Sequence, residues 1–201
     1  SGTGALLSGV DLDLYNAADD SRVTITATTA IDGTYLLGPL APGSYKLRCD
    51  PTPEQFLAVE YFDSKLRLVD ANPIIVVSGA GATGRNFVLD GGATIRGRVT
   101  RASSGAALSG IDIDVLTAGT FLRLDQSAKT DANGNFVAGP LPVGTYIVRA
   151  DAPLGSAFLD AYFPASTTTT GATVLTISAG ADLPNINITL PENPRQGWLL
   201  Q

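Results

Sequence analysis

Apolar and acidic residues alternate in two short stretches of the chain, VDLDLY at 10–15 and IDIDV at 111–115. Alternation with a period of two is typical of a β-strand that has one face in a core. In the first stretch, Val10, Leu12 and Leu14 are therefore expected to point inward. The pattern predicts strands rather than helices.

Similar stretches separated by turn residues occur along the whole chain. SYKLRCD and TYIVRAD also alternate, so that Tyr45, Leu47 and Cys49 are expected to face inward. Gly, Pro, Asp and Asn gather between the strands, as in DG at 32–33 and DANGN at 131–135. This spacing indicates an all-β protein with about seven strands in each half, as in a β-sandwich.

The chain contains one pattern twice. Ser109 stands 101 positions after Ser8, since 109 − 8 = 101, and at this shift the two halves align without a gap. ALLSGVDLDL lies over AALSGIDIDV, and IDGTYLLGPLAPGSYKLRCD lies over ANGNFVAGPLPVGTYIVRAD. Two tandem β-sandwich repeats follow, at 1–90 and 91–190, with a further segment at 191–201.

Composition excludes several classes of function. The hydrophobic fraction of 44% is large enough for a core, while a net charge of −6 argues against binding to nucleic acid. The chain has no His, the commonest acid–base and metal ligand near neutral pH. The longest apolar stretch, NPIIVVSGAGA, is too short to span a bilayer. We therefore expect no enzyme activity, no membrane span and no nucleic-acid partner.

Two acidic pairs are candidates for a metal or catalytic site. Asp11 and Asp13 are two positions apart on one strand, and Asp112 and Asp114 repeat the arrangement. Paired carboxyls on one strand face could bind a metal or act in glycoside hydrolysis. Both pairs are expected to be exposed and to form ion pairs with outward arginines such as Arg48, so the surface ion-pair interpretation is favoured.

The stretch TDANGNF has the oxygen donors of a calcium loop in Asp131, Asn133 and Asn135. An EF-hand loop needs Gly at its sixth position and Glu at its twelfth, which here are Phe136 and Pro142. A hairpin turn explains the stretch better. No metal and no cofactor are expected, and the single Cys49 is interpreted as a buried side chain.

A family resemblance rests on a run of Gly, aromatic and Leu positions that both repeats share. The first repeat carries it in Gly33, Tyr35, Leu40, Gly43 and Tyr45, and the second carries it from Asp131 to Tyr146. The run resembles the carboxypeptidase regulatory-like and Cna-B-like modules of the transthyretin-like group. The resemblance implies a Greek-key β-sandwich, commonly strung in tandem as a stalk or spacer on bacterial surface and secreted proteins.

The two repeats differ in their opening strand. The second repeat begins with ATIRGRVT at 93–100, whereas the first is expected to lack its counterpart, because SGTGALLSG corresponds to the loop after that strand. The C-terminal RQGWLLQ resembles the missing strand when Gly197 is matched to Gly97. The segment 191–201 is therefore predicted to be a strand that completes repeat 1 of a neighbouring chain.

This hypothesis assigns residues to a donor and an acceptor side. The donor residues are Gly197, Trp198, Leu199 and Leu200, and the acceptor residues are Val10, Leu12 and Leu14. Two registers stay open: one turns Leu199 inward, and the other, shifted by one position, turns Trp198 and Leu200 inward. The alternative is a piece of a longer tandem array, in which adjacent repeats of the same chain supply the strand.

The expected function is a non-enzymatic structural module of an extracellular or cell-surface protein. It would act as a spacer, stalk or filament subunit, with copies of itself as partners from head to tail. The alternative is a carbohydrate-binding or adhesive accessory module with surface glycans as partners. Such a module needs an exposed aromatic cluster, and Tyr61, Phe62, Tyr162 and Phe163 recur at matching places that suit core packing better.

Overall fold

A computed structural model describes residues 4–194. The chain divides into two compact units, Ser1–Gly92 (unit 1) and Ala93–Gln201 (unit 2). Both units are built from β-strands, and the only helical elements among the described residues are three short 3-10 turns. These turns are η1 (Pro53–Gln55), η2 (Leu68–Asp70) and η3 (Thr169–Gly171). The all-β fold class predicted from the sequence is confirmed.

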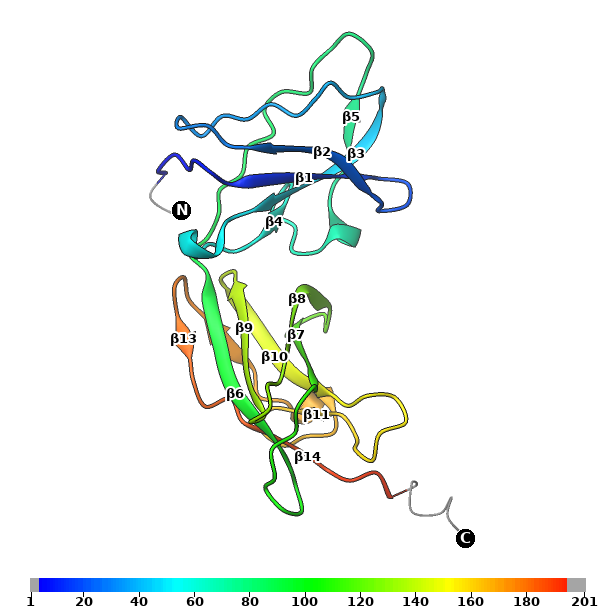
Figure 1. Cartoon of the computed structure of the whole chain (residues 1–201), viewed down its shortest axis with the longest axis vertical. Coiled ribbons are helices and arrows are strands. Elements are labelled where there is room, and N and C mark those ends of the chain that lie inside the picture. The colour runs from blue at the N-terminus through cyan, green and yellow to red at the C-terminus, as the bar shows by residue number, and fades with distance from the viewer. Residues whose placement is uncertain (1–3, 195–201) are drawn as a thin grey trace. The chain divides into compact units, whose positions relative to one another are not determined.

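Unit 1 forms a single sheet in the described residues (Figure 1). The sheet order is β2-β1-β3-β4. Strand β5 pairs with the same edge of β3 as β4 does, at the start of β3 rather than at its end. Its strands are β1 (Asp11–Asn16), β2 (Arg22–Thr28), β3 (Gly43–Asp50), β4 (Glu60–Tyr61) and β5 (Ile74–Val76). Because β1 and β3 are antiparallel neighbours, their inward side chains line one face of the sheet.

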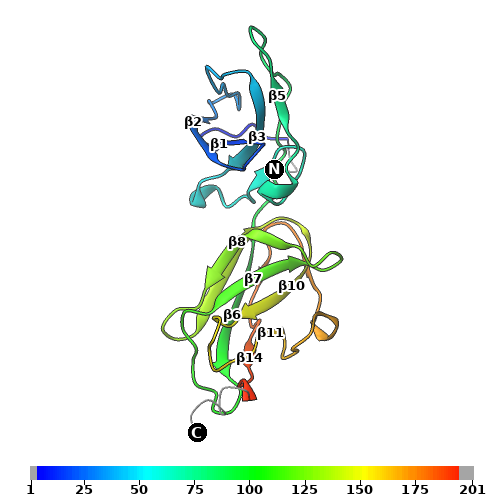
Figure 2. The same cartoon turned by 90° about the vertical axis from the view of Figure 1, so that its right-hand side faces the viewer.

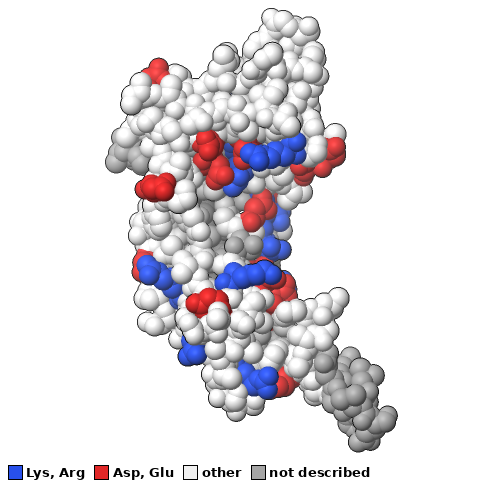
Figure 3. Space-filling view, in the orientation of Figure 1, with Lys and Arg blue, Asp and Glu red and all other residues white. Residues whose placement is uncertain are grey.

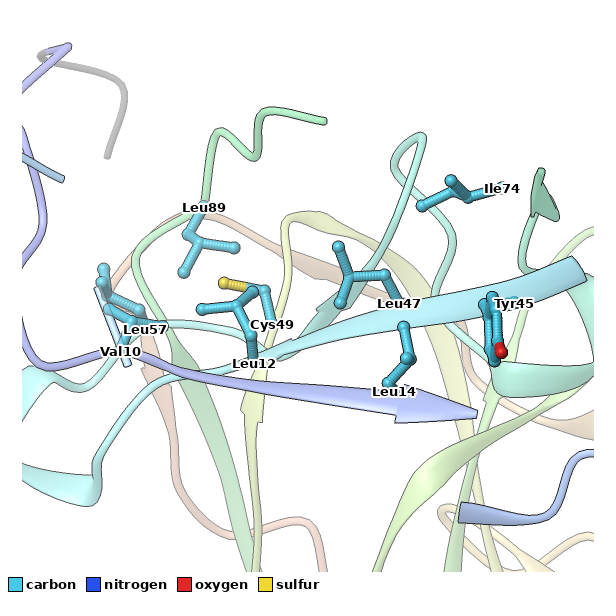
Figure 4. Close-up of a cluster of buried hydrophobic side chains, with 9 residues drawn as sticks. All are labelled: Val10, Leu12, Leu14, Tyr45, Leu47, Cys49, Leu57, Ile74 and Leu89. Atoms are coloured by element: carbon cyan, nitrogen blue, oxygen red, sulfur yellow. The ribbon is translucent and has the colours of Figure 1, made fainter. Parts of the chain in front are cut away.

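The core of unit 1 lies on that face. Figure 4 shows the inward side chains of β1 and β3 together with Leu89, which comes from the end of the unit. The prediction of the inward positions on these two strands is confirmed, because all of them are buried. These positions are Val10, Leu12, Leu14, Tyr45, Leu47 and Cys49.

Unit 2 has two sheets. One repeats the sheet of unit 1, with the order β11-β10-β7-β8 and β12 paired to β10, and Figure 2 shows its main strands as neighbouring arrows. The other is centred on β6 (Ala93–Arg101), which pairs with β9, β13 and β14. The remaining strands are β7 (Asp112–Thr117), β8 (Arg123–Lys129), β9 (Asn135–Leu141), β10 (Gly144–Asp151), β11 (Ala161–Tyr162), β12 (Leu175–Ile177), β13 (Asp182–Leu183) and β14 (Ile188–Leu190).

The two sheets of unit 2 enclose one apolar core, as a sandwich requires. Ile95 and Val99 of β6 are 0% exposed, and Ile113 of β7 on the other sheet is also 0% exposed. Five strands are described in unit 1 and nine in unit 2, whereas the sequence predicts about seven in each. The difference arises because the second sheet is found only in unit 2 among the described residues.

Each unit contains one copy of the same sheet, β2-β1-β3-β4 in unit 1 and β11-β10-β7-β8 in unit 2, called the shared sheet here. Its outer face carries ion pairs. Asp13 contacts Arg22 and Arg48, with Arg48 Nη1 3.1 Å from Asp13 Oδ2. The prediction of ion pairs with the outward arginines is thus confirmed, but the prediction that both acidic pairs are exposed is wrong for Asp13 and Asp114. Asp13 is 5% exposed because the long arginine side chains fold over it. On the face shown in Figure 3, acidic and basic side chains lie beside one another.

The turn at 130–134 does not form a hairpin within one sheet. It links β8, which pairs with β7, to β9, which pairs with β6 in the other sheet. The Asp131 carboxylate accepts hydrogen bonds from the backbone amides of Asn133 (2.9 Å) and Asn135 (2.8 Å). The bond from Asn135, followed by that from Asn133, lowers the pKa of Asp131, so this carboxylate stabilises the turn itself.

Burial of Cys49 gives a testable reactivity. Desolvation raises the pKa of the Cys49 thiol to about 12, so the native thiol is protonated at pH 8. We expect a maleimide or iodoacetamide reagent to leave Cys49 unmodified in the native protein and to modify it fully in denaturant, as read by mass spectrometry. Rapid modification of the native protein at pH 8 would contradict this burial.

Candidate strand-binding site

Strand β6 is held on both sides in unit 2. On one side it runs antiparallel to β9, with Gly97 opposite Phe136 and Arg98 opposite Asn135. On the other side it runs parallel to β14, with Val99 beside Ile188. Because β6 is the strand that β9, β13 and β14 all pair with, this sheet depends on it.

Gly97, at the middle of β6, lies where no side chain fits. A Cβ atom built on Gly97 would be 1.9 Å from the backbone oxygen of Ile186 and 2.9 Å from the ring of Phe136. Two other glycines of unit 2 also face the β6 backbone closely. A Cβ on Gly134 would lie 2.5 Å from the Val99 oxygen, and one on Gly139 would lie 2.4 Å from the Ala93 oxygen.

Unit 1 contains the counterparts of β9 and β14 without a strand between them. At the shift of 101 positions, β9 corresponds to 34–40 and the stretch from Ile186 to Leu190 corresponds to 85–89. Both segments are drawn as coil in Figure 1, and neither takes part in a ladder with described residues. Among the described residues, unit 1 thus has the two sides of the site but no strand in the place of β6.

The glycines that face β6 are also kept in unit 1. Gly33 and Gly38 have positive φ, as Gly134 and Gly139 do. A Cβ on Gly38 would meet only the Leu40 nitrogen, at 3.5 Å. The space that the β6 backbone takes beside Gly139 is therefore not filled by described residues at Gly38.

Side chains along the site are less buried in unit 1 than in unit 2. Tyr35, Leu37 and Phe87 pack against the core but are only half-buried. Their counterparts in unit 2 are buried: Phe136 is 3%, Ala138 2% and Ile188 0% exposed. The unit 1 core is thus covered incompletely at the place where β6 lies in unit 2.

Two polar groups mark the middle of the site in unit 1. The hydroxyl of Tyr35 donates a hydrogen bond to the Arg85 backbone oxygen, and this bond joins the two segments. Desolvation raises the pKa of Tyr35 to about 12. Asn86 is exposed, whereas its counterpart Asn187 accepts a hydrogen bond from the Arg98 backbone amide of β6 at 3.0 Å.

The acceptor residues predicted from the sequence lie beneath this site rather than on its surface. Val10 is 1%, Leu12 0% and Leu14 3% exposed. They pack in the same cluster as Leu37 and Phe87, which come from the two segments and cover them. The sequence predicts the sheet face that carries Val10, Leu12 and Leu14, but we did not predict from it that segments 34–40 and 85–89 line the site. The alignment of these segments with β9 and β14 could have identified them. The predicted donor residues Gly197, Trp198, Leu199 and Leu200 lie outside the described residues.

Other candidate sites have ordinary structural roles. Tyr61 is 4% exposed, and Phe62 packs edge-on against Phe87 with ring centroids 6.2 Å apart. Tyr162 and Phe163 are half-buried. Over residues 4–194, no group of three or more His, Cys, Asp or Glu side chains is placed to hold a metal ion. No helix in this range has the length and apolar character that crossing a membrane requires.

A family model matches the second half of the chain. Residues 94–191 match the carboxypeptidase regulatory-like domain, which corresponds to unit 2 from the second residue of β6 to the residue after β14. No curated protein matches the chain.

Several solved structures of bacterial proteins resemble the chain at low identity. The minor pilin GBS52 of Streptococcus agalactiae is 13% identical with a TM-score of 0.36, covering 94% of this chain and 85% of that one. The shaft pilin SpaA of Lactobacillus rhamnosus GG is 15% identical with a TM-score of 0.34, covering 96% and 91%.

The TIE protein of Bacillus anthracis is 12% identical with a TM-score of 0.36 over 92% of this chain, and this chain spans 30% of its length. The chain also spans 57% of the length of a matched chain from a cohesin–X-dockerin complex of Acetivibrio cellulolyticus. TM-scores below 0.5 at such identities say nothing about function.

Proposed function

We propose that the chain, whose residues 94–191 form a carboxypeptidase regulatory-like domain, is a non-enzymatic structural module of an extracellular or cell-surface protein. In this proposal it is a spacer or filament subunit, and neighbouring copies join head to tail by donating a strand. The tandem duplication of one sandwich pattern supports a spacer, because a repeated module lengthens a protein without adding a new site.

One observation carries the assembly part of this proposal. The same sequence pattern forms two sheets in unit 2, where β6 is present, and one sheet in the described part of unit 1, where no strand takes its place. Segments 34–40 and 85–89 therefore take part in no ladder with described residues, although the Thr34 and Arg85 oxygens accept single hydrogen bonds, and they lie next to half-buried apolar side chains. Unpaired strand edges of this kind bind an added strand through main-chain hydrogen bonds.

Removal of residues 195–201 tests this assembly. Truncation at 194 keeps Glu192 and Asn193, which bond to unit 2 through the Ser103 hydroxyl and the Ala157 oxygen. We expect the full chain to form concentration-dependent linear species in light scattering and electron microscopy, and the truncated chain to be monomeric.

The matched control replaces 195–201 by a Gly/Ser segment of equal length, which keeps the chain length but removes the side chains. It should behave like the truncated chain, and the circular dichroism of all three proteins should agree. If the full and truncated chains give the same species, head-to-tail strand donation is wrong.

The location outside the cell is tested separately. Protease added to intact cells of the native host should degrade the protein, while a cytoplasmic marker stays intact. Protection of the protein under these conditions would contradict an extracellular or surface location.

A further inference from the structure

We propose that the site of unit 1 accepts a strand in a single register, fixed by a glycine over the Tyr35–Arg85 contact, and that Gly197 of a second copy is this glycine. The inference rests on the proposed strand donation and specifies its geometry. It decides between the two registers that the sequence leaves open.

The constraint comes from the middle of β6. In unit 2 the inward position between Ile95 and Val99 is Gly97, because the Ile186 oxygen and the Phe136 ring leave no room for a Cβ. In unit 1 the same place lies between Arg85, which corresponds to Ile186, and Tyr35, which corresponds to Phe136. The Tyr35 hydroxyl reaches the Arg85 oxygen there, so a side chain placed at this point would meet both groups.

Only one register of the C-terminal segment meets this constraint. With Gly197 at the place of Gly97, Leu199 takes the inward place of Val99, and Trp198 points outward as the exposed Arg98 does. A shift by one position would put the Trp198 side chain at the place where, in unit 2, not even a Cβ fits. Gly197 is the only glycine in residues 191–201, so this segment offers no other position that meets the constraint.

The other contacts of β6 follow in the same register. Trp198 falls opposite Thr34, as Arg98 lies opposite Asn135, and Leu199 falls beside Phe87, as Val99 lies beside Ile188. The backbone amide of Trp198 then meets the exposed Asn86, the counterpart of the Asn187 acceptor. Arg195 takes the inward place of Ile95, which is 0% exposed in unit 2 and lies opposite Ala138, so its guanidinium has to extend along its aliphatic stem to reach water.

The donor in this proposal is a second copy, because residues 190–197 of the same chain can at most run back along the length of β6. Leu190 pairs with Arg101, the last residue of β6, whereas unit 1 precedes Ala93 at the other end of that strand. The eight steps from 93 to 101 span about 26 Å. The seven steps from 190 to 197 reach about 25 Å at full extension, so Gly197 at most reaches the Ala93 end of β6.

Disulfide trapping tests the register in the full chain. Cys49 is first replaced by Ala, which is the residue at the corresponding position 150. Thr34→Cys with Trp198→Cys should then give interchain disulfides under oxidation, because residues directly opposite each other have Cα atoms about 4.5–5.5 Å apart. Thr34→Cys with Leu199→Cys is the control for the shifted register and should stay reduced. Efficient trapping of the control pair instead would overturn the inference while leaving strand donation intact.

Peptide binding tests the glycine without relying on assembly. A peptide of residues 192–201 is added to the chain truncated at 194, beside the same peptide with Gly197→Val. We expect the variant to bind about tenfold more weakly or worse, as measured by calorimetry or fluorescence of Trp198.

Equal binding of both peptides would overturn the glycine constraint, and absence of binding by either would overturn the site itself. If the truncated and full chains assemble alike but the native peptide still binds selectively, the proposed assembly fails and the register stands.

Discussion

Replacing Gly97 by Ala is expected to destabilise unit 2 by about 3 kcal/mol or more. The added Cβ would lie 1.9 Å from the Ile186 oxygen, and this oxygen belongs to backbone that is held by the bond from the Ile186 amide to the Arg96 oxygen at 2.9 Å. Relief of the clash requires β6 to separate from the segment before β14. Because β6 is the centre of its sheet, such a shift also weakens its pairing with β9.

Calorimetry with a matched glycine checks this prediction. Gly119 has no atom within 4 Å of a built Cβ and no positive φ. Gly119→Ala should therefore leave stability unchanged or raise it by up to about 1 kcal/mol, by restricting the unfolded chain. Gly97→Ala should lower the melting temperature of the unit 2 transition by more than about 10 °C. Equal melting temperatures for the two variants would show that β6 does not approach Ile186 closely.

The comparison of the two units shows why part of the fold follows from local sequence and part does not. Alternation placed Val10 and Leu12 correctly, because a strand with one buried face needs no information beyond its own residues. Segment 34–40 has nearly the pattern of β9 but is coil, because a strand needs a partner for its backbone. The sequence of the segment is thus not sufficient to decide its secondary structure.

The candidate site depends on contacts between residues far apart in the chain. Repeat alignment matched Gly197 to Gly97, but it did not reveal that Gly97 lies against Ile186, 89 positions later since 186 − 97 = 89. Nor did it show that the Tyr35 hydroxyl bonds to the Arg85 oxygen. Such contacts exist only once both sheets are placed, which is why the sequence left two registers open.

The buried acidic residues show the same limit. Alternation correctly put Asp13 and Asp114 on the outer face of the shared sheet, where residues are usually exposed. Both are buried because two arginines from the neighbouring strands lie over each carboxylate. The sequence contains these arginines, but their positions over the aspartates follow from the strand register.

Because of this arrangement, Asp114 is the polar residue of unit 2 whose replacement should lower the free energy of unfolding the most. Its side chain is 1% exposed, Arg149 Nη2 lies 2.5 Å from its Oδ2, and Arg123 Nε lies 2.8 Å from its Oδ1. Asp114→Asn keeps the volume but removes the charge and turns an amide donor toward guanidinium donors. Removal of one partner from a buried ion pair costs about 3–5 kcal/mol, and because Arg149 is 26% and Arg123 54% exposed, we expect about 2–3 kcal/mol.

Asp112 is the matched control for this substitution. It lies two positions earlier on the same strand face, its side chain is 45% exposed, and its partner Lys129 is 68% exposed at 3.2 Å. Asp112→Asn should change the free energy of unfolding by less than about 0.5 kcal/mol, because exposed pairs are screened by water. Urea unfolding followed by circular dichroism measures both variants. If Asp114→Asn lowers the free energy of unfolding no more than Asp112→Asn does, the charge of the Asp114 carboxylate does not contribute to stability, although the arginines cover it.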